Sequence, residues 1–413
     1  MRTTILRKDV HPLALEVCAA LQQHGYQAFI VGGCVRDLLL EKTPKDWDIC
    51  TDADPEQVAA IFPRTLPTGL QHGTVTVCMG EGVENHFEVT TFRVEGQYTD
   101  GRRPEVVHFV KKVEEDLARR DLTINAIAYD PIANRAVDPF MGIFDLKNEM
   151  IRAVGKPVER FQEDGLRIMR VARFAARFGY KVDEETLAGM RDALETLKKV
   201  SKERVADELR KTLMTESPGY GLLILLSSGA MDIACPILTS YDTSILPLAR
   251  QCYGHLETRL AFLYHHIPVE RVEQELLDLK MSTKEIKRVV FLLTTLAKFY
   301  SFKECSTLLA YRKFIARIKN EAPDPWEYTY EQFIELAKAL GQPFEKLTFY
   351  DDEVVPARKE LAINGNDLMA LGITPGPKLK LLLDNCYQEI LIRPEKNTKE
   401  YLLDLVRDAI QGQ

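Results

Sequence analysis

The sequence predicts an α+β sheet domain at the N-terminal end of the chain, followed by an all-α region that fills the rest. Three observations predict this fold class. Over about the first 150 residues, short apolar runs rich in β-branched residues alternate with helix-like segments. From about residue 157 onward the apolar periodicity is helical, and no strand pattern of comparable strength returns. The length of 413 residues predicts two or three domains, and an apolar content of 46% is enough for their cores.

The N-terminal domain is predicted to hold several strands with two or three helices. Its strand-like runs lie at 26–31, 46–50, 74–79, 86–92 and 106–110. Its helix-like segments lie at 9–24, 35–40 and 55–62. Gly25 ends the first of these helices, and Pro55 opens the third, because proline fits the first helical turn. The runs at 74–79 and 86–92 are expected to pair around a turn at 80–85.

Helices are predicted throughout the remainder of the chain. The clearest periodic segments lie at 162–178, 184–197, 201–213 and 219–229. Helix-like segments continue to residue 413. The prolines that separate them are Pro236, Pro268, Pro323, Pro325, Pro343, Pro375 and Pro377. An extended helical body is therefore expected behind the sheet domain.

Charge and cysteine usage exclude several classes of protein. The net charge of −7 argues against a generally basic protein that binds nucleic acid without regard to sequence. The longest apolar stretches fall far short of the ~20 residues of a membrane span, and the N-terminus lacks the apolar core of a signal peptide. Eight cysteines occur without a CxxC pair or a zinc-like spacing, which predicts reduced, buried thiols. We therefore expect a cytoplasmic protein with no membrane partner.

A double glycine lies between the first predicted strand and the helix that follows it. Gly32 and Gly33 allow backbone amides to approach a ligand closely, and a helix N-terminus favours an anion. Arg36 falls in the first helical turn, where its guanidinium can add a charged fork to a phosphate. The alternative is a tight turn that carries a surface arginine.

Two aspartates follow on the next predicted strand. Asp46 and Asp48 are two positions apart, so both carboxylates project from one face while Trp47 turns to the opposite, buried face. Two like charges this close favour a cation between them, and Mg²⁺ shared with substrate phosphates usually takes one or two carboxylates. Glu88, in the middle of an apolar strand, is a candidate third acid because its carboxylate needs a partner. The alternatives are solvated aspartates at a strand edge and an outward-facing glutamate.

Arginines in two later segments are candidates for contacts with phosphates and bases. In the first segment, Arg119 and Arg120 stand beside Asp121. This arrangement is typical of phosphate or ribose contacts that a fixed salt bridge holds in place. The alternative is a charged corner between a helix and a strand.

The second segment, 152–177, carries a local charge of +4 from seven basic and three acidic residues. On a helix Asp164 and Arg167 share one face, where they can match one edge of a nucleobase. Asp164 would accept from the exocyclic amine of C or A, Arg167 would donate to the adjacent ring nitrogen, and the carbonyls of G and U would be rejected. Arg170 and Arg173 continue a row that spirals, so these side chains cannot all meet the same atoms. The alternative is a solvated salt bridge between residues three positions apart.

Seven motifs, taken in order, resemble those of one family. They are GGCVRD, DWDI, HGTV, FEVTTFR, DGRRP, EEDLARRDLTINAIA and EDGLRIMRVARF. Their order resembles that of the bacterial class II tRNA nucleotidyltransferases, the CCA-adding enzymes, together with their bacterial poly(A) polymerase relatives. The close similarity covers about residues 25–215, and looser agreement continues to the end of the sequence.

The resemblance implies a fold, an activity and partners. The fold is a polymerase-β-like nucleotidyltransferase head at 1–150, a helical neck with the nucleotide-reading helix at 151–215, a helical body at 216–345 and a helical, tRNA-binding tail at 346–413. The implied activity is template-independent addition of C, C and A to the 3′ end of tRNA. Its substrates are CTP and ATP, its cofactor is Mg²⁺, and pyrophosphate is released. No oligomeric state follows from the resemblance.

The same resemblance implies roles for individual residues. Asp46 and Asp48 fall at the positions of metal ligands, and Glu88 falls at that of a third, less widely marked catalytic acid. Asp164 and Arg167 fall on the base-reading pair. The nucleotide-contact positions are Gly33, Arg36, Arg120, Asp164, Arg167, Arg170 and Arg173.

Alternatives are left open inside the family and outside it. The segment 93–104 matches a flexible loop that CC-only enzymes are expected to lack, and HGTV matches the CCA-adding pattern more than that of poly(A) polymerases. An A-only-adding enzyme would keep all these motifs, so it stays an alternative, as does a bacterial poly(A) polymerase. A non-catalytic tRNA-binding protein is disfavoured because no metal carboxylate is lost. An enzyme that acts on small molecules would not need so long a helical body.

Overall fold

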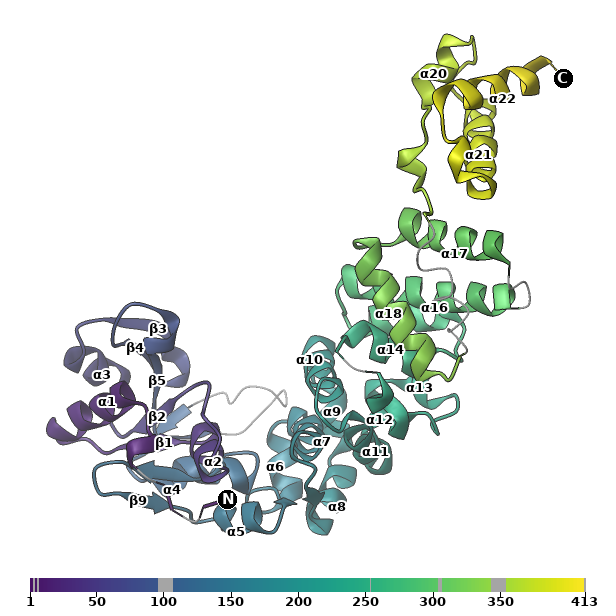
Figure 1. Ribbon diagram of the computed structural model, residues 1–413. Coiled ribbons are helices and arrows are strands. Elements are labelled where there is room, and N and C mark those ends of the chain that lie inside the picture. The colour runs from purple at the N-terminus through teal and green to yellow at the C-terminus, as the bar shows by residue number, and fades with distance from the viewer. Residues whose placement is uncertain are drawn as a thin grey trace. The chain divides into compact units, whose positions relative to one another are not determined.

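The computed structural model describes residues 1–411 except 3, 6, 96–106, 253, 304–306 and 343–353. The chain forms two compact units, Met1–Arg250 and Gln251–Gln413. The first unit begins with a mixed β-sheet and continues in helices, and the described part of the second unit is helical (Figure 1). The predicted fold class, a sheet domain followed by an all-α region, is confirmed.

A seven-stranded sheet forms the centre of the N-terminal domain, in the order β3-β4-β5-β2-β1-β8-β9. Its strands are β1 (Ala28–Val31), β2 (Asp48–Thr51), β3 (Thr65–Gly69), β4 (Thr74–Cys78), β5 (His86–Thr91), β8 (Ala128–Asp130) and β9 (Arg135–Val137). β2 and β5 run parallel, and every other neighbouring pair runs antiparallel. Because β2 lies between β1 and β5, the residues that begin β2 lie near the middle of the sheet.

Helices and a buried apolar cluster complete this domain. The α-helices are α1 (Pro12–Gln23), α2 (Gly33–Leu39), α3 (Pro55–Ile61), α4 (Val113–Ala118) and α5 (Gly142–Lys147). α1 buries its apolar face, including Val17 and Leu21. One buried cluster contains Phe29 of β1, Leu117 of α4 and also Phe92. This cluster fixes α4 against the sheet.

The sequence analysis predicted some strands of this sheet and missed others. β1, β4 and β5 lie within predicted runs, whereas β2 begins at Asp48 and leaves Asp46 in the bend before it. β3, β8 and β9 escaped prediction because β3 is mostly exposed and the other two have 3 residues each. The predicted strand 106–110 corresponds to β7 (Val107–Phe109), which pairs with β6 (Arg93–Glu95) in a separate two-stranded sheet.

The rest of the first unit consists mainly of short helices. They are α6 (Pro157–Glu163), α7 (Leu166–Phe178), α8 (Glu184–Asp192), α9 (Leu194–Lys198), α10 (Lys202–Leu213), α11 (Pro218–Ser228), α12 (Ala230–Ala234) and α13 (Pro236–Thr239). A short parallel pair, β10 (Met150–Ile151) and β11 (Lys181–Val182), lies among them. The single helix predicted at 162–178 is wrong, because Asp164 is extended and separates α6 from α7. A Cβ on Gly165 would lie 2.6 Å from the backbone N of Leu197, so glycine is needed where this junction meets α9.

The second unit is built around aromatic side chains. Its described helices are α14 (Leu256–Tyr264), α15 (Val269–Asp278), α16 (Thr283–Lys303), α17 (Leu308–Glu321), α18 (Trp326–Ala339), α20 (Gly365–Ala370), α21 (Pro377–Ile392) and α22 (Lys399–Gln411). Phe299, Phe314 and Phe333 join α16, α17 and α18, with ring centroids 5.0 to 5.8 Å apart. Arg288 of α16 pairs with Asp324 and Glu257, at 2.5 and 2.7 Å.

Short 3₁₀ helices occur in both units and complete the list of elements among the described residues. They lie at Arg7–Asp9, Leu70–His72, Val83–Asn85, Thr123–Asn125, Leu246–Gln251, Arg358–Glu360 and Pro394–Lys396. Within the described residues, no helix combines the length and the apolar character that a membrane crossing requires.

Candidate active site

The glycine turn after β1 lies directly against an arginine. Gly32 has a φ of +81°, a region that favours glycine, and a Cβ there would lie 2.8 Å from Nη1 of Arg120. Gly33 is the first residue of α2, so the N-terminus of this helix follows the turn at once. The predicted turn is therefore present, and a cation is fixed beside it.

Carboxylates gather at the start of β2 and at the facing position of β5. Asp48 pairs in register with Glu88, so the two side chains leave the sheet on the same face. Asp46 lies just before β2, and Trp47 between the two aspartates is buried, as predicted. Burial raises the pKa of Asp48; Arg120 opposes this rise, whereas Glu88 and Asp46 add to it. The half-buried Asp48 is thus the centre of a negatively charged group.

These carboxylate oxygens are suitable ligands for a hard divalent cation that is shared with a substrate. Among the described residues, no group of three or more His, Cys, Asp or Glu side chains is arranged to hold a metal ion by itself. Mg²⁺ bound together with substrate phosphates needs only one or two protein carboxylates. Asp46 and Asp48 supply that number, and a cation would neutralise the charge that raises the pKa of Asp48. The residues therefore fit such a metal.

Arg119 and Arg120 follow α4 and are held by Asp116. Their Nη2 atoms lie 2.8 and 3.4 Å from its carboxylate. Burial alone would raise the pKa of Asp116, but the two guanidinium groups outweigh burial and lower it. The salt bridge expected between this pair and Asp121 is therefore wrong, because Asp116, one helical turn earlier, takes that place. Arg120 also donates to the carbonyl of Asn125 at 3.5 Å.

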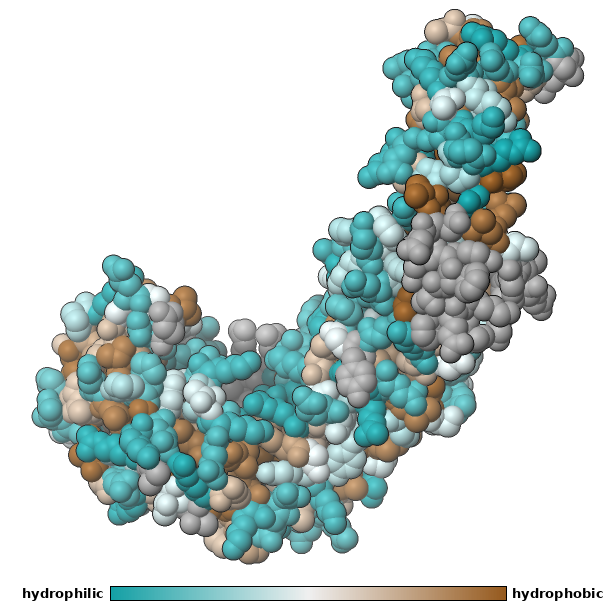
Figure 2. Space-filling view, in the orientation of Figure 1, coloured by the Kyte–Doolittle hydropathy of each residue, from teal (hydrophilic) through white to brown (hydrophobic). Residues whose placement is uncertain are grey.

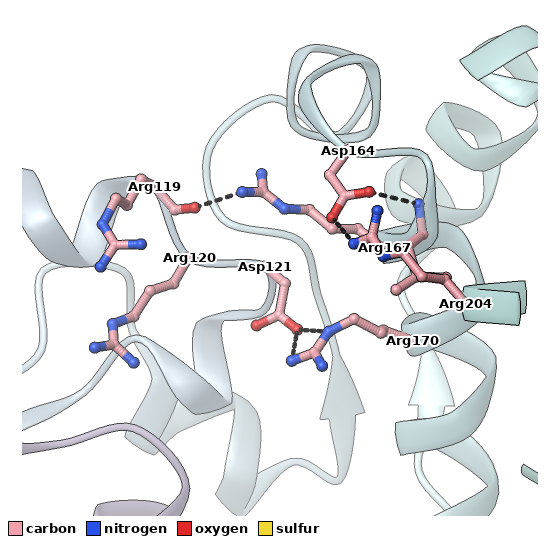
Figure 3. A pocket seen from close by; sticks show the side chains of 8 residues that line it. Arg119, Arg120, Asp121, Asp164, Arg167, Arg170 and Arg204 are labelled. Atoms are coloured by element: carbon pink, nitrogen blue, oxygen red, sulfur yellow. Dashed lines mark hydrogen bonds and ion pairs between the residues drawn. The ribbon is translucent and has the colours of Figure 1, made fainter. Parts of the chain in front are cut away.

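A cavity of about 300 Å³ opens beside these arginines (Figure 3). Its lining residues are Arg119, Arg120, Asp121, Asp164, Leu166, Arg167, Arg170 and Arg204. Five arginines and two aspartates leave a surplus of three positive charges, five minus two. A cavity of this charge suits an anionic ligand, and the two carboxylates add acceptors for its polar groups.

Asp164 and Arg167 both line the cavity, but different partners hold them (Figure 3). The Asp164 carboxylate accepts from Nη2 of Arg204 in α10 at 2.8 Å. Arg167 donates to Glu163 at 2.6 Å and to the carbonyl of Arg119 at 2.9 Å. The two residues do not lie on one helix, and they are joined by a backbone hydrogen bond, from the N–H of Arg167 to the carbonyl of Asp164, at 3.0 Å. The alternative of a solvated salt bridge between them is therefore wrong.

Arg170 and Arg173 differ in their closest acidic partner, although the Arg170 guanidinium also lies 4.0 Å from Glu208. Arg170 lines the cavity and donates from Nε to Asp121 at 2.7 Å. Arg173 is not among the lining residues and donates from Nε to the buried Glu208 at 2.5 Å. Burial alone would raise the pKa of Asp121, but the charge and hydrogen bonds of Arg170 outweigh burial and hold that pKa at about 2. Asp121 is thus an anion at the cavity wall near neutral pH.

Arg36 is buried, so the alternative of a surface arginine is wrong. Only 4% of this residue is exposed. Its guanidinium donates to Asp37 at 2.9 Å and to the side chain of Asn125 at 2.5 Å. It also lies 5.5 and 5.1 Å from the ring centroids of Phe174 and Phe178 in α7. Arg36 therefore joins the glycine turn to the helix that carries the cavity arginines.

Sequence reasoning missed three residues that hold the site together: Asn125, Arg204 and Glu208. Glu208 had a detectable signal, since it falls on the same helical face as Val205 and Leu209 and is buried with them. A buried glutamate on an apolar face needs a cation as partner. Arg204 carries no such signal, because its role depends on which helix lies beside α10. The predicted loop at 93–104 lies outside the described residues from residue 96 onward.

Paired carboxylates at the start of a central strand, with Arg120 between them and an arginine-rich cavity, are typical of a nucleotidyltransferase. Three family models match the chain. "Poly A polymerase head domain" matches residues 28–152, "Probable RNA and SrmB- binding site of polymerase A" matches 179–242, and "tRNA nucleotidyltransferase domain 2 putative" matches 256–406.

Full-length relatives show to which family of nucleotidyltransferases the chain is similar. The chain is 35% identical over 406 residues to a CCA-adding enzyme of Lactococcus lactis subsp. cremoris (strain SK11), covering 96% of each chain. It is 35% identical over 407 residues to one of Anoxybacillus flavithermus (strain DSM 21510 / WK1), covering 94% of this chain and 95% of the relative. The crystal structure of the Bacillus stearothermophilus CCA-adding enzyme in complex with CTP matches with a TM-score of 0.79 and 32% identity over 98% of this chain and 100% of the other. The chain belongs to the CCA-adding enzymes, a family of tRNA nucleotidyltransferases, and the resemblance seen in its motifs is confirmed.

Proposed function

We propose that this chain completes the 3′ end of tRNA by adding C, C and A in turn from CTP and ATP, with release of pyrophosphate. The observation that carries the proposal is the position of Arg120. This residue lines the arginine-rich cavity, lies against the turn at Gly32 and acts electrostatically on Asp48. A nucleotide held in the cavity would therefore have its phosphates beside the carboxylates. The names of the full-length relatives support the choice of CTP, ATP and tRNA as substrates.

In this proposal Asp46 and Asp48 hold Mg²⁺, and Glu88 is the third acid beside them. A metal held by these residues would supply activation of the tRNA 3′ hydroxyl and neutralisation of charge on the triphosphate. Asp48 must be ionised to bind it, and Arg120 favours the ionised form whereas Glu88 disfavours it. The positive charge beside the turn at Gly33 also attracts the triphosphate.

The base is read by Asp164 and Arg167 at the cavity wall. Both C and A present an exocyclic amine next to a ring nitrogen, whereas G and U present a carbonyl in that place. Asp164 accepts from the amine and Arg167 donates to the ring nitrogen. Arg204 and Glu163 fix the two side chains, at 2.8 and 2.6 Å, so that a mismatched base leaves polar groups unpaired.

The remaining arginines divide into direct contacts and supporting contacts. Arg120 and Arg170 line the cavity and contact the nucleotide there. Arg36 and Arg173 were predicted to contact the nucleotide, but neither lines the cavity. In this proposal they bind Asn125 and Glu208 and hold the turn and α7 in place. The tail at residues 346–413 contacts the tRNA. A cytoplasmic location follows from this substrate.

The length of the product on a tRNA that lacks its last three nucleotides tests the proposal. The reaction is run with CTP alone, with ATP alone and with both, in the presence of Mg²⁺. Addition that stops at CC with CTP, and at CCA with both, is the expected result. No use of CTP would indicate an A-only-adding enzyme.

A poly(A) polymerase is the second candidate, favoured by the description of the matching head model. A long homopolymer of A in the same assay would support it against CCA addition. The Asp48→Ala variant is the control in every arm, because loss of its activity shows that the product comes from this chain.

A further inference from the structure

Phe174 lies at the centre of the arginines behind the cavity. Its ring centroid is 4.2 Å from the guanidinium carbon of Arg173 and 5.5 Å from those of Arg170 and Arg36. Arg170 and Arg173 belong to α7, whereas Arg36 comes from α2. Only 5% of Phe174 is exposed, and it is not among the residues that line the cavity. The ring therefore touches these arginines without facing a ligand.

Each of the two α7 arginines is held by an acid as well as by the ring. Arg170 bonds to Asp121 at 2.7 Å, and Arg173 bonds to Glu208 at 2.5 Å. The acid holds one edge of the guanidinium, and the negative face of the ring attracts the cation from another side. Two constraints of different kinds thus act on one group. The Arg170 guanidinium donates from both Nε and Nη2 to Asp121, and Phe174 adds a contact with its face.

The ring also offsets repulsion among the cations. Burial lowers the pKa of Arg173; Glu208 opposes this effect, and the charge of Arg170 adds to it. Burial likewise lowers the pKa of Arg36. The negative face of Phe174 attracts all three guanidinium groups, which a saturated side chain of similar volume does not do. The aromatic character of residue 174 therefore has a role that apolar packing alone does not explain.

We propose that Phe174 is a positioning residue for nucleotide selection, an inference that rests on the proposed function. Its ring helps to hold the Arg170 guanidinium at the cavity wall and attracts that of Arg173 behind it. Arg170 is the member of this group that lines the cavity, so its orientation is part of the surface that a nucleotide meets. Phe174 thus acts on the nucleotide through Arg170 and makes no contact of its own.

The Phe174→Leu variant tests this proposal, because leucine keeps apolar bulk and removes the ring. We measure kcat and KM separately for CTP and for ATP, together with the frequency of UTP and GTP incorporation. Loss of a buried cation–π contact predicts a rise of about five- to tenfold in KM and a similar rise in misincorporation. The value of kcat should change by less than about threefold, because the metal carboxylates are untouched. Phe174→Tyr keeps the ring and should restore KM to within about twofold.

Phe178→Leu is the matched control on the same helix. Phe178 stacks on Phe174, with ring centroids 6.1 Å apart and planes at 9°. The cations near its ring are Arg36, Arg177 and Lys42, and none of these lines the cavity. A loss of aromatic packing alone would affect both variants, whereas the proposal predicts that Phe178→Leu changes KM and misincorporation by less than about twofold.

Melting curves show which variants are folded at the assay temperature. If Phe174→Leu is unfolded at that temperature, we use Phe174→Met in its place, because methionine fills the space with a flexible side chain. An unchanged KM and misincorporation frequency in a folded variant without the ring overturns the proposal, and so does a failure of Phe174→Tyr to restore them. Failure of the proposed function is distinct, since the wild-type chain would then add no CCA.

Discussion

At the scale of single residues, three carboxylates lie close together at the start of β2 and on the neighbouring β5. Asp48 is half-buried beside Glu88 and Asp46, and burial raises its pKa. A carboxylate in this position favours either a proton or a cation, because both remove the cost of the buried charge. A divalent ion bound together with a triphosphate would be such a cation. In the proposed function the metal therefore removes a cost that burial of the Asp48 charge would otherwise carry.

Asp48→Asn keeps the size of the side chain and removes its charge. We expect nucleotide addition to fall by a factor of about a hundred or more, while tRNA affinity stays within about twofold. Asp46→Ala should behave in the same way. Incorporation of labelled CTP with Mg²⁺ as the sole metal measures the first quantity, and filter binding of tRNA measures the second. Turnover like that of the wild type in either variant would remove the metal assignment.

Arg167→Ala should damage the choice of nucleotide more than the binding of tRNA. In the proposed function the variant removes a donor to the base, and each unpaired polar group costs about 1–3 kcal/mol, or roughly tenfold to a hundredfold in discrimination. Arg177→Ala is the control, because Arg177 is on the same helix, is 45% exposed and does not line the cavity. Competition of UTP and GTP against CTP measures the effect. If both variants exclude UTP and GTP as strictly as the wild type, α7 does not read the base.

At the scale of elements, apolar periodicity located the helices but missed where α6 ends and α7 begins. Periodicity reports which side chains are buried, and it continues across the junction at Asp164 and Gly165. The break depends on a contact with α9, about 30 residues later in the chain, where a Cβ on Gly165 would meet the backbone of Thr196 at 2.6 Å. Such a contact leaves no trace in the local pattern. The junction matters for function because it takes Asp164 out of the helix and turns it toward Arg204.

Gly165→Ala should therefore be far more destabilising than an ordinary glycine substitution. The added Cβ must push the α6–α7 junction away from α9, at a cost of about 3 kcal/mol, and Asp164 moves with it. Gly179→Ala is the comparison. Gly179 has a φ of +72° but open space around its Cβ, so strain alone costs about 1 kcal/mol. Denaturant unfolding measures both, and a smaller loss of stability for Gly165→Ala than for Gly179→Ala contradicts the argument.

At the scale of the whole molecule, the sequence predicted the order of its parts and most of the charged residues around the site. Asp46, Asp48 and the arginines of α7 stand in motifs whose residue types reveal their chemistry. The partners of these residues were not predictable, because they come from helices that meet only in the folded chain. Arg204 is 40 positions from Asp164, and Glu208 is 35 positions from Arg173. A sequence motif therefore identifies the charged side chains, whereas the residues that orient them are known only from the folded structure.

The Asp121–Arg170 pair is one such contact, and it makes the stability of the first unit depend on pH. The segment before β8 holds Asp121, and α7 holds Arg170, so the pair ties the sheet domain to the helices that follow it. The pKa of Asp121 is lowered from 3.8 to about 2 in the folded chain. A group with a depressed pKa contributes stability that is present above its unfolded pKa and is lost as the pH falls through its folded pKa.

Asp121→Asn should therefore cost about 2 kcal/mol of unfolding free energy above pH 4, and this cost should shrink as the pH falls from about 4 to 2. The reason is that the wild type loses the same ion pair by protonation over that range. Asp207→Asn is the control, because Asp207 pairs with Lys211 at 2.6 Å on the surface of α10, where an ion pair contributes little at any pH. Urea unfolding of the wild type and both variants between pH 2.5 and 6 measures the differences, because most of the protonation of Asp121 in the unfolded chain falls in this window. A difference between the wild type and Asp121→Asn that stays constant across the range would show that the carboxylate of Asp121 acts through packing, and that its charge does not hold the two parts of this unit together.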